Sequence, residues 1–234
     1  MKLATAIQTI APLERDTLGR RAYAELRHLI MAGRIDPGEH LSLRTVAQAL
    51  GTSVMPVREA VSRLVAEQAL EVAPNRAVRV PHLGAARFRE LTAIRIEIEG
   101  FATEQAAARR TRDDLKGMAE AEAAFRSESL SATPDLAKAV AMNMDFHFAV
   151  YRAAAMPSLV EIIESLWLRI GPVINLETRG NPQRLMTGGA YRRHRLALRA
   201  IRRQDGPAAR AAIAEDIRVT AEFLLARGDL GPAA

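Results

Sequence analysis

Residues 41 to 80 constrain the fold of this chain more than any other stretch, because two short helical patterns separated by a glycine precede two β-prone runs. The first pattern, Leu43–Leu50, ends before Gly51, a residue that tolerates the left-handed conformation common at helix C-termini. The second begins near Val54, behind Ser53 as a candidate N-cap, and keeps an apolar stripe for about three turns. This short connection containing glycine is typical of a helix-turn-helix, whose second helix enters the DNA major groove.

The two β-prone runs, Leu70–Val72 and Ala77–Val80, flank the turn-forming cluster Pro74-Asn75-Arg76. They predict a small two-stranded wing behind the helix-turn-helix. Two amphipathic helices joined by a glycine also occur in ordinary helical domains, so that pattern alone gives DNA binding about even odds. The wing, and the arginines at the helix starts and beside the turn, favour the DNA-binding interpretation.

Composition sets wider limits on the class of protein. The 234 residues suit one or two domains, and the formal net charge of +6 favours weak attraction to phosphates, although a solvated surface of mixed sign is the simpler explanation. The sequence has no cysteine, which excludes disulfides and thiolate metal sites. Because it shows neither a long apolar run nor a signal-peptide pattern, we expect a soluble, cytoplasmic protein without a membrane partner.

The run Pro81-His82-Leu83-Gly84 interrupts regular structure and marks a domain boundary. We therefore divide the chain into an N-terminal segment (1–16), a winged helix-turn-helix domain (17–81), a linker (82–84) and an all-helical domain (85–234). The fold class is mainly α, and the last domain is predicted to be an antiparallel bundle of about six helices, with room for an interior site. These helices are expected over 85–110, 113–130, 134–155, 157–177, 185–204 and 207–227.

Polar residues within the predicted bundle point to a ligand site. Asn143 and His147 are four residues apart, so they share one helix face. His194 and Asp216 lie at equal distances on either side of Asp205, at a predicted turn, so an antiparallel hairpin brings them to matching heights roughly 16 Å from the turn. They are expected to face each other. Apolar walls around them are expected from Phe146, Phe148, Leu196 and Ile213.

Four motifs in the N-terminal part are characteristic: Ile30-Met31-Ala32-Gly33-Arg34-Ile35-Asp36-Pro37-Gly38-Glu39-His40-Leu41, Thr45-Val46-Ala47, Pro56-Val57-Arg58-Glu59-Ala60-Val61-Ser62-Arg63-Leu64 and Asn75-Arg76-Ala77-Val78. Through them, nearly all of residues 17–81 resembles the GntR superfamily of bacterial transcription regulators, in particular its FadR-type branch. The resemblance implies a set of DNA-contacting residues, namely Arg44, Ser53, Val54, Met55, Pro56, Arg58, Asn75 and Arg76. Many relatives carry arginine where this chain has Val54 and glycine where it has Ala77, and an apolar Val54 or Met55 could instead touch a thymine methyl.

The bundle resembles the FCD effector domain of the same regulators, in which an Asp or Asn four residues before a His joins two later His around a divalent metal. Asn143, His147 and His194 fall on three of these positions, and Asp216 stands where the third histidine usually stands. The resemblance implies a zinc, nickel or manganese site and an anionic effector held with help from Arg95 of an Arg-x-x-x-Glu motif that ends at Glu99. Six helices are closer to the shorter, VanR-like effector domains than to the seven-helix acyl-CoA binder.

Each of these roles has a simpler alternative. A buried histidine such as His147 is usually a hydrogen-bonded core residue, and Arg95 with Glu99 could be an intrahelical ion pair worth a few tenths of a kcal/mol. Asp216 could be a surface carboxylate. The cluster Arg192-Arg193-His194-Arg195 could be a solvated face with one inward residue.

Residues and resemblance together predict a ligand-controlled transcription regulator, a repressor by resemblance, that binds an inverted-repeat operator as a homodimer and a small organic acid in its bundle. The alternative is a metal-dependent helical-bundle enzyme acting on a small carboxylate. Its signature would be repeated Glu-x-x-His pairs on facing helices, and that spacing occurs only at Glu25-Leu26-Arg27-His28, in the DNA-binding part. We therefore expect no enzyme. An interaction protein that does not bind DNA is a third open class.

Overall fold

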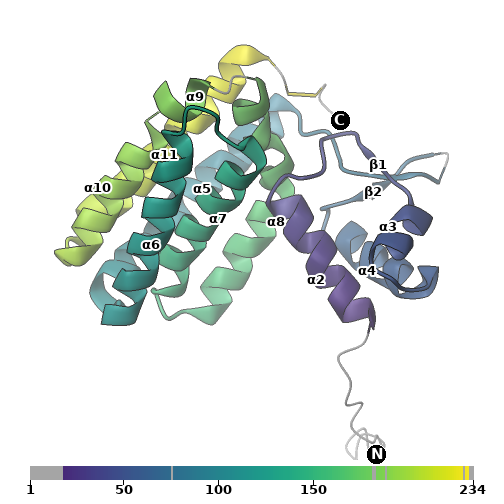
Figure 1. Cartoon of the computed structure of the whole chain (residues 1–234), viewed down its shortest axis with the longest axis horizontal. Helices are drawn as coiled ribbons and strands as arrows, with labels where there is room; N and C mark the ends of the chain where they lie inside the picture. Colours follow the sequence, from purple (N-terminus) through teal and green to yellow (C-terminus); the bar gives the residue numbers. More distant parts are fainter. Residues whose placement is uncertain (1–17, 75, 181–182, 188, 229, 232–234) are drawn as a thin grey trace, which may run out of the picture.

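The computed structural model describes residues 18–74, 76–180, 183–187, 189–228 and 230–231, which form two parts (Figure 1). The predicted segment 1–16 lies outside these residues. The N-terminal part contains α2 (Leu18–Met31), β1 (His40–Leu41), α3 (Leu43–Ala49), α4 (Val54–Ala66), β2 (Glu71–Val72) and β3 (Val78–Arg79). The C-terminal part contains α5 (Ala85–Arg109), α6 (Arg112–Ser129), α7 (Leu136–Arg152), α8 (Pro157–Gly180), α9 (Gln183–Thr187), α10 (Ala190–Arg202) and α11 (Gly206–Arg227).

Helices α3 and α4 are the predicted helix-turn-helix. The Ser42 side chain starts α3 by accepting a hydrogen bond from the Thr45 N–H at 3.3 Å, and Gly51 follows the end of α3 with a φ of 61°. Helix α4 buries the stripe Val57, Ala60, Val61 and Leu64. It packs on α2, whose Leu26 and Ile30 are buried in the same core. The opposite face of α4, which includes Arg58, Glu59 and Ser62, is therefore exposed.

The wing is a three-stranded antiparallel sheet in the order β1-β3-β2, and not the two-stranded hairpin predicted. The predicted hairpin is present as β2 and β3, with Glu71 opposite Arg79. Strand β1 adds to the other side, where His40 pairs with Arg79. Since β1 has two residues, it is too short to show the alternation of apolar and polar residues by which a strand is recognised in a sequence.

The helical bundle differs from the prediction at one helix. The helix expected over 185–204 is divided into α9 and α10, because Gly189 before α10 adopts a left-handed φ of 73°. Counting α9, the described residues form seven helices in this part rather than six, so the helix count no longer favours the shorter effector domains. The other five predicted helices correspond to α5, α6, α7, α8 and α11, with ends displaced by a few residues.

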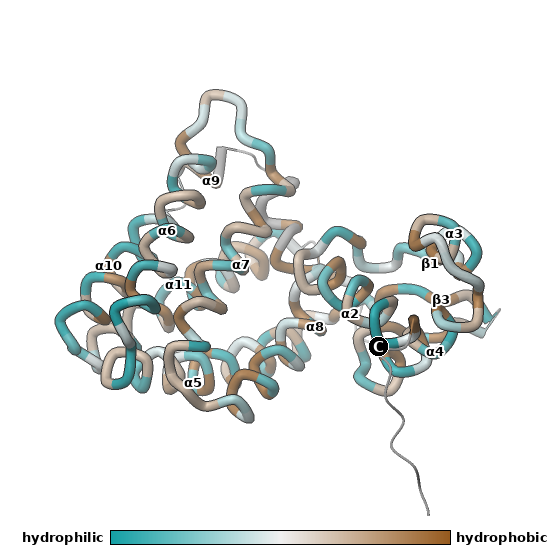
Figure 2. The backbone as a smooth tube through the Cα atoms, turned by 60° about the horizontal axis from the view of Figure 1, so that its bottom comes forward, coloured by the Kyte–Doolittle hydropathy of each residue, from teal (hydrophilic) through white to brown (hydrophobic). Residues whose placement is uncertain are grey.

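Helix α5 is central to the bundle and contacts α7, α8, α10 and α11, while α6 packs with α7 and α10 with α11. In Figure 2, hydrophobic and hydrophilic residues alternate along the helices, as expected for helices that bury one face. Among the described residues, no helix combines the length and the apolar character that crossing a bilayer requires.

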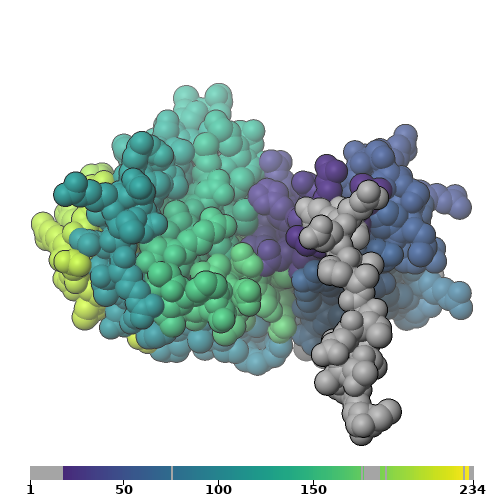
Figure 3. Space-filling view, turned by 90° about the horizontal axis from the view of Figure 1, so that it is seen from below, coloured from purple at the N-terminus to yellow at the C-terminus, as the bar shows by residue number. Residues whose placement is uncertain are grey.

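Helices α2 and α8 lie side by side between the two parts (Figures 1 and 3). Gly171 permits this approach, since a Cβ at that position would lie 2.6 Å from the backbone oxygen of Met31. A guanidinium nitrogen of Arg27 on α2 also pairs with a carboxylate oxygen of Glu164 on α8 at 2.5 Å. The run predicted as linker lies between β3 and α5, and its Gly84 forms a parallel bridge with Gly231. Helix α8 therefore contacts the N-terminal part directly.

Candidate functional site

The predicted DNA-contacting side chains of the two helices lie at the surface of the N-terminal part. Arg44 on α3 and Arg58 on α4 are exposed, and Met55 is 61% exposed. Val54 and Pro56, in the first turn of α4, are half-buried. An exposed methionine contributes little to the core of its own domain, so its position at the start of α4 leaves it available for a partner.

Ser53 occupies the N-cap position of α4, but its side chain makes no capping hydrogen bond. The first N–H groups of a helix have no partner within the helix and carry a partial positive charge, which suits a phosphate. In the wing, Arg76 is exposed at a φ of 62°, whereas Arg79 is paired with Glu71 at 2.6 Å. Asn75, also predicted to contact DNA, lies outside the described residues.

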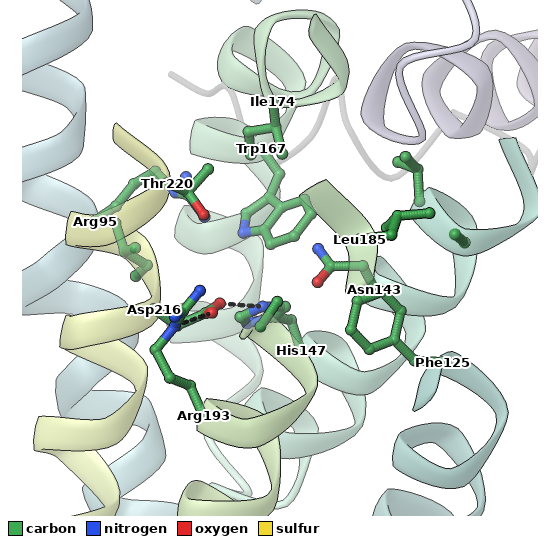
Figure 4. A pocket seen from close by; sticks show the side chains of 14 residues that line it. Arg95, Phe125, Asn143, His147, Trp167, Ile174, Leu185, Arg193, Asp216 and Thr220 are labelled. Atoms are coloured by element: carbon green, nitrogen blue, oxygen red, sulfur yellow. Dashed lines mark hydrogen bonds and ion pairs between the residues drawn. The ribbon is translucent and has the colours of Figure 1, made fainter. Parts of the chain in front are cut away.

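A cavity of about 60 Å³ opens inside the bundle (Figure 4). Its walls come from α5, α6, α7, α8, α10 and α11 as well as α9, so the site depends on the assembled bundle. Its polar and aromatic lining residues are Arg95, Phe125, Asn143, His147, Trp167, Arg193, Asp216 and Thr220. Space of this size holds a few waters or a small ligand.

His147, His194 and Asp216 form a buried cluster whose ligand atoms lie within 4.8 Å of one another. The Nε2 atom of His147 lies 3.3 Å from Oδ2 of Asp216, and the Nε2 atom of His194 lies 3.5 Å from the same oxygen. Asn143, one turn before His147 on α7, lines the same cavity (Figure 4). The hairpin of α10 and α11 thus brings His194 and Asp216 face to face.

A buried chain of hydrogen bonds orients His147. Arg95 donates to Glu99 from Nε at 2.5 Å, the Tyr151 hydroxyl donates to the Glu99 carboxylate, and Nδ1 of His147 lies 2.9 Å from the Tyr151 oxygen. Tyr151 has one hydroxyl proton, and because that proton goes to Glu99, His147 must donate from Nδ1. The Nε2 lone pair of a neutral His147 then faces the Asp216 carboxylate. Nε2 of His147 and Oδ2 of Asp216 are then two hydrogen-bond acceptors 3.3 Å apart. Such a pair requires a cation between them, either a proton or a metal ion.

The ionisation of the cluster suits a metal ion. Burial alone would raise the pKa of Asp216, but the contacts with His147 and His194 outweigh burial and hold that pKa well below its usual range. Burial lowers the pKa of His194, which favours the neutral ring. Burial also raises the pKa of Tyr151 well above 10.0, which keeps its hydroxyl protonated. An ionised carboxylate and a neutral imidazole are the forms in which these groups bind metals.

His194 carries the clearest sign of a ligand-binding role. Its side chain is 0% exposed, and neither ring nitrogen has a hydrogen-bond partner among the described residues. Phe146 stacks on the ring at a centroid distance of 4.2 Å. Buried polar atoms are normally paired, so an unpaired Nε2 directed at a carboxylate fits a cation bound between the two. The residues present therefore fit a divalent metal.

Arg95 lines the cavity, with its guanidinium carbon 5.0 Å from the Trp167 ring centroid. Burial would lower the pKa of Arg95, but Glu99 raises it, so the guanidinium stays charged. Glu99 is 0% exposed and is not among the residues that line the cavity. Glu99 therefore holds Arg95 and Tyr151 in place, whereas Arg95 is the member of the pair that can reach a ligand.

Two polar residues that contact the His147, His194 and Asp216 cluster were not predicted from the sequence, and neither were the lining residues Phe125, Trp167 and Thr220. Arg193 turns inward, and its Nε lies 2.9 Å from Oδ1 of Asp216, so the run around His194 is not simply a solvated face. Tyr151 could have been predicted as a site residue, because Asn143, His147 and Tyr151 follow one another at a spacing of four and therefore share one helix face. One predicted wall residue is wrong: Leu196 is 54% exposed, because a residue two positions from His194 lies about 200° around the helix.

Comparisons with known proteins agree on the family. The profile of "Bacterial regulatory proteins, gntR family" matches residues 18–80, and that of the FCD domain matches residues 90–219. The chain is 34% identical over 192 residues to the HTH-type transcriptional regulator McbR of Escherichia coli (strain K12), covering 82% of this chain and 85% of that protein.

Solved structures agree with these matches. The structure of E. coli McbR/YncC aligns with a TM-score of 0.83 at 31% identity over 91% of this chain and 99% of that chain. A GntR protein of Rhodococcus sp. RHA1, at 22% identity, shares the fold with a TM-score of 0.73 over 89% of this chain and 97% of that one. The chain therefore belongs to the GntR family of bacterial regulatory proteins and is a DNA-binding transcription regulator with a C-terminal FCD effector domain.

Proposed function

We propose that this regulator is a repressor that binds an inverted-repeat operator as a homodimer and leaves it when a small organic acid binds in the FCD domain. A two-fold symmetric dimer matches a two-fold symmetric operator, with one recognition helix in each half-site. The acid must bind the arrangement that is incompetent for DNA more tightly than the competent one, because only a difference in affinity shifts the equilibrium.

In the proposed complex, α4 enters the major groove by its N-terminal end. Arg58 reads base edges, and the exposed Met55, with Val54 and Pro56 beside it, contacts thymine methyl groups. Arg44, Ser53 and the wing residues Asn75 and Arg76 contact the phosphate backbone or the minor groove. Phosphate contacts position the protein, while the few base contacts supply specificity.

The proposed metal ligands are Asn143, His147, His194 and Asp216, and the unpaired His194 ring is the observation that carries this assignment. Zinc, nickel or manganese fits two imidazoles and one carboxylate, with Asn143 as a weaker neutral ligand. When bound, the metal would act as a Lewis acid that accepts an oxygen of the effector. Tyr151 and Glu99 hold His147 in the tautomer that leaves Nε2 free.

The preference for an acid follows from the charges around the cavity. Arg95 is paired with Glu99 and Arg193 with Asp216, so these four groups sum to zero. A divalent metal would make the site net positive and favour a carboxylate in the cavity. Arg95 and Arg193 both line that cavity and offer further donors to the anion. Effector binding is therefore proposed to require the metal.

We infer that the protein is not an enzyme. Its relatives are transcription regulators, and the histidines and carboxylates of the cavity are accounted for by metal and effector binding. Incubation with zinc, nickel or manganese and a panel of small carboxylic acids should give no product; turnover that needs His147 would replace the regulator interpretation of the cavity.

The first experiment is elemental metal analysis of protein purified without chelator. The wild type should hold about one zinc, nickel or manganese per chain, and the His147→Ala, His194→Ala variant none. The matched control is His28→Ala, His82→Ala, which removes two exposed histidines and should retain the metal. Metal absent from the wild type even after it is added back would refute the metal centre.

A second measurement tests the regulatory role separately. In gel-shift assays with the upstream DNA, the His147→Ala, His194→Ala variant should bind its operator as the wild type does but no longer respond to candidate organic acids. An unchanged response would remove both histidines from the effector site. Failure of the wild type to shift any upstream DNA at low salt would count against operator binding itself.

A further inference from the structure

A second cavity, separate from the metal centre, lies where the two parts of the molecule meet. Its volume is about 510 Å³, within the range of sites that bind small organic molecules. One wall comes from the end of α4, the residues between α4 and β2, β2 itself and the two residues after β3, and the other from Leu83, α5 and α8. Its lining includes Leu70, Val72, Arg87, Leu91, Leu168 and Arg169. We call this cavity the interdomain cleft.

The cleft is apolar over most of its lining, but the part of the chain that the structure describes offers no acidic partner to Arg169. Arg169 is half-buried, and no ion pair among the described residues involves it. Its Nε is fully enclosed and has no hydrogen-bond partner within the described ranges. Arg87, the other arginine of the lining, is by contrast paired with Glu90 at 2.6 Å. An enclosed donor on a charged group is costly unless an acceptor reaches it.

Two further features make the cleft wall receptive to a ligand. Pro172 has no N–H, so the carbonyl of Leu168, four residues earlier on α8, lacks its usual helical partner. Val72 on β2 is 56% exposed although it lies beside the leucines of the cleft. A ligand with an apolar body would remove this exposed surface from water.

We propose that the interdomain cleft is a second ligand site, which takes an amphipathic anion: a carboxylate, sulfonate or phosphate head on Arg169 and an apolar body against Leu70, Leu91 and Leu168. The anionic head accepts hydrogen bonds from the guanidinium, including the enclosed Nε, and such charge-assisted bonds are the strong ones. The site does not involve the metal ligands and does not rest on the proposed repressor role.

A ligand in the cleft would touch both parts of the molecule at once. Leu168, Arg169 and Pro172 belong to α8, and the same helix carries Trp167 and Ile174 to the cavity of the metal centre. Because the ligand binds surfaces of both parts, it favours the arrangement in which the cleft is formed. The two cavities are therefore coupled through α8, and each ligand must change the affinity of the other by the same factor.

Fluorescence titration with two matched probes tests the proposal on the full-length protein. Anilinonaphthalene sulfonate is an amphipathic anion, and N-phenylnaphthylamine is the same apolar body without the sulfonate. The wild type should bind both, and Arg169→Gln should weaken the sulfonate by about tenfold while leaving the neutral probe unchanged. Arg169→Lys should recover part of the loss. Arg89→Gln, which removes an exposed arginine outside the cleft lining, should affect neither probe.

A second pair of variants locates the probes. Val72→Trp places a large side chain over the cleft and should weaken both probes, whereas Ile162→Trp changes an equally exposed apolar residue of α8 that does not line the cleft and should weaken neither. No binding to the wild type, equal effects of Arg169→Gln on the two probes, or unchanged binding to Val72→Trp would each overturn the proposal. Circular dichroism melting of every variant separates these outcomes from loss of the fold.

Discussion

Asp216 divides its two carboxylate oxygens between different tasks. Oδ1 accepts from Arg193 at 2.9 Å, whereas Oδ2 faces the Nε2 atoms of His147 and His194 at 3.3 and 3.5 Å. Arg193 therefore orients the carboxylate and leaves the other oxygen for the proposed metal. On the opposite side of His147, Tyr151 and Glu99 fix the ring by its other nitrogen.

Tyr151→Phe should weaken metal binding without removing a ligand. The change deletes the hydroxyl that holds Nδ1 of His147, and loss of such a supporting contact typically costs about 10- to 100-fold in metal affinity. Calorimetric titration of the metal-free protein with zinc measures the affinity. The control is Phe148→Leu. Phe148 is a buried aromatic neighbour of Tyr151 and makes no polar contact with the His147 ring. Equal affinities for wild type and Tyr151→Phe would mean that the tyrosine only fills space.

Arg58→Ala should reduce specific operator binding while the fold stays intact. A side chain that reads a base pair by paired hydrogen bonds is worth about 1–3 kcal/mol of discrimination, or roughly 5- to 150-fold. Gel-shift titration with operator and with unrelated DNA gives the specificity ratio. Arg112→Ala removes the same charge from the exposed start of α6 and should leave the ratio unchanged. Retained specificity in Arg58→Ala would remove Arg58 from the reading set.

Among the elements, α8 contacts both the cavity of the bundle and the N-terminal part. Trp167 and Ile174 line the metal-centre cavity, and Gly171 lies against the end of α2. Pro172 interrupts the hydrogen-bond ladder of the helix at the same level, which tends to bend a helix. A displacement at the cavity can therefore be transmitted to α2 through direct packing.

Gly171→Ala should destabilise the protein. The new Cβ would lie 2.6 Å from the Met31 oxygen and 2.8 Å from that of Ile30, so α8 and α2 must move apart. Overpacking of this kind costs about 1–3 kcal/mol. Urea unfolding measures the loss. Gly117→Ala, in α6 with no atom within 4 Å of the new methyl, is the matched control and should be neutral or stabilising by up to about 1 kcal/mol. Similar results for both variants would contradict the close approach.

At the scale of the whole molecule, the proposed metal site lies where α5, α7, α10 and α11 meet. Its proposed ligands come from α7, α10 and α11, and its supporting groups Arg95 and Glu99 come from α5. These helices are brought together only in the folded bundle. A metal that binds there binds the native state alone and must stabilise it.

Metal should therefore raise the melting temperature. At free zinc one hundred times its dissociation constant, the stabilisation is about 2.7 kcal/mol, which corresponds to roughly 5–10 °C for a chain of this size. Differential scanning calorimetry with zinc, and then with excess chelator, measures the shift. His147→Ala, His194→Ala should melt at one temperature in both conditions. A shift of equal size in that variant would place the stabilising metal elsewhere.

The sequence by itself determined the helix-turn-helix, the hairpin of the wing and most of the bundle helices. These elements depend on local signals, namely the helical spacing of apolar residues, Gly51 after α3 and prolines at helix starts. It also predicted that His194 and Asp216 would meet, because the rise of a helix fixes heights along a hairpin once its turn is known.

Only the tertiary structure decided the rest of the site. Arg193 turns inward to Asp216, Tyr151 joins His147 to Glu99 of another helix, and the two-residue strand β1 pairs with β3. Each of these contacts joins residues far apart in the chain, and each depends on how a helix is rotated or a strand placed against its neighbours. The periodicity of apolar residues predicts which face of a helix or strand is buried. Which polar side chains at the edge of that face contact one another is decided by how the elements pack in the assembled core.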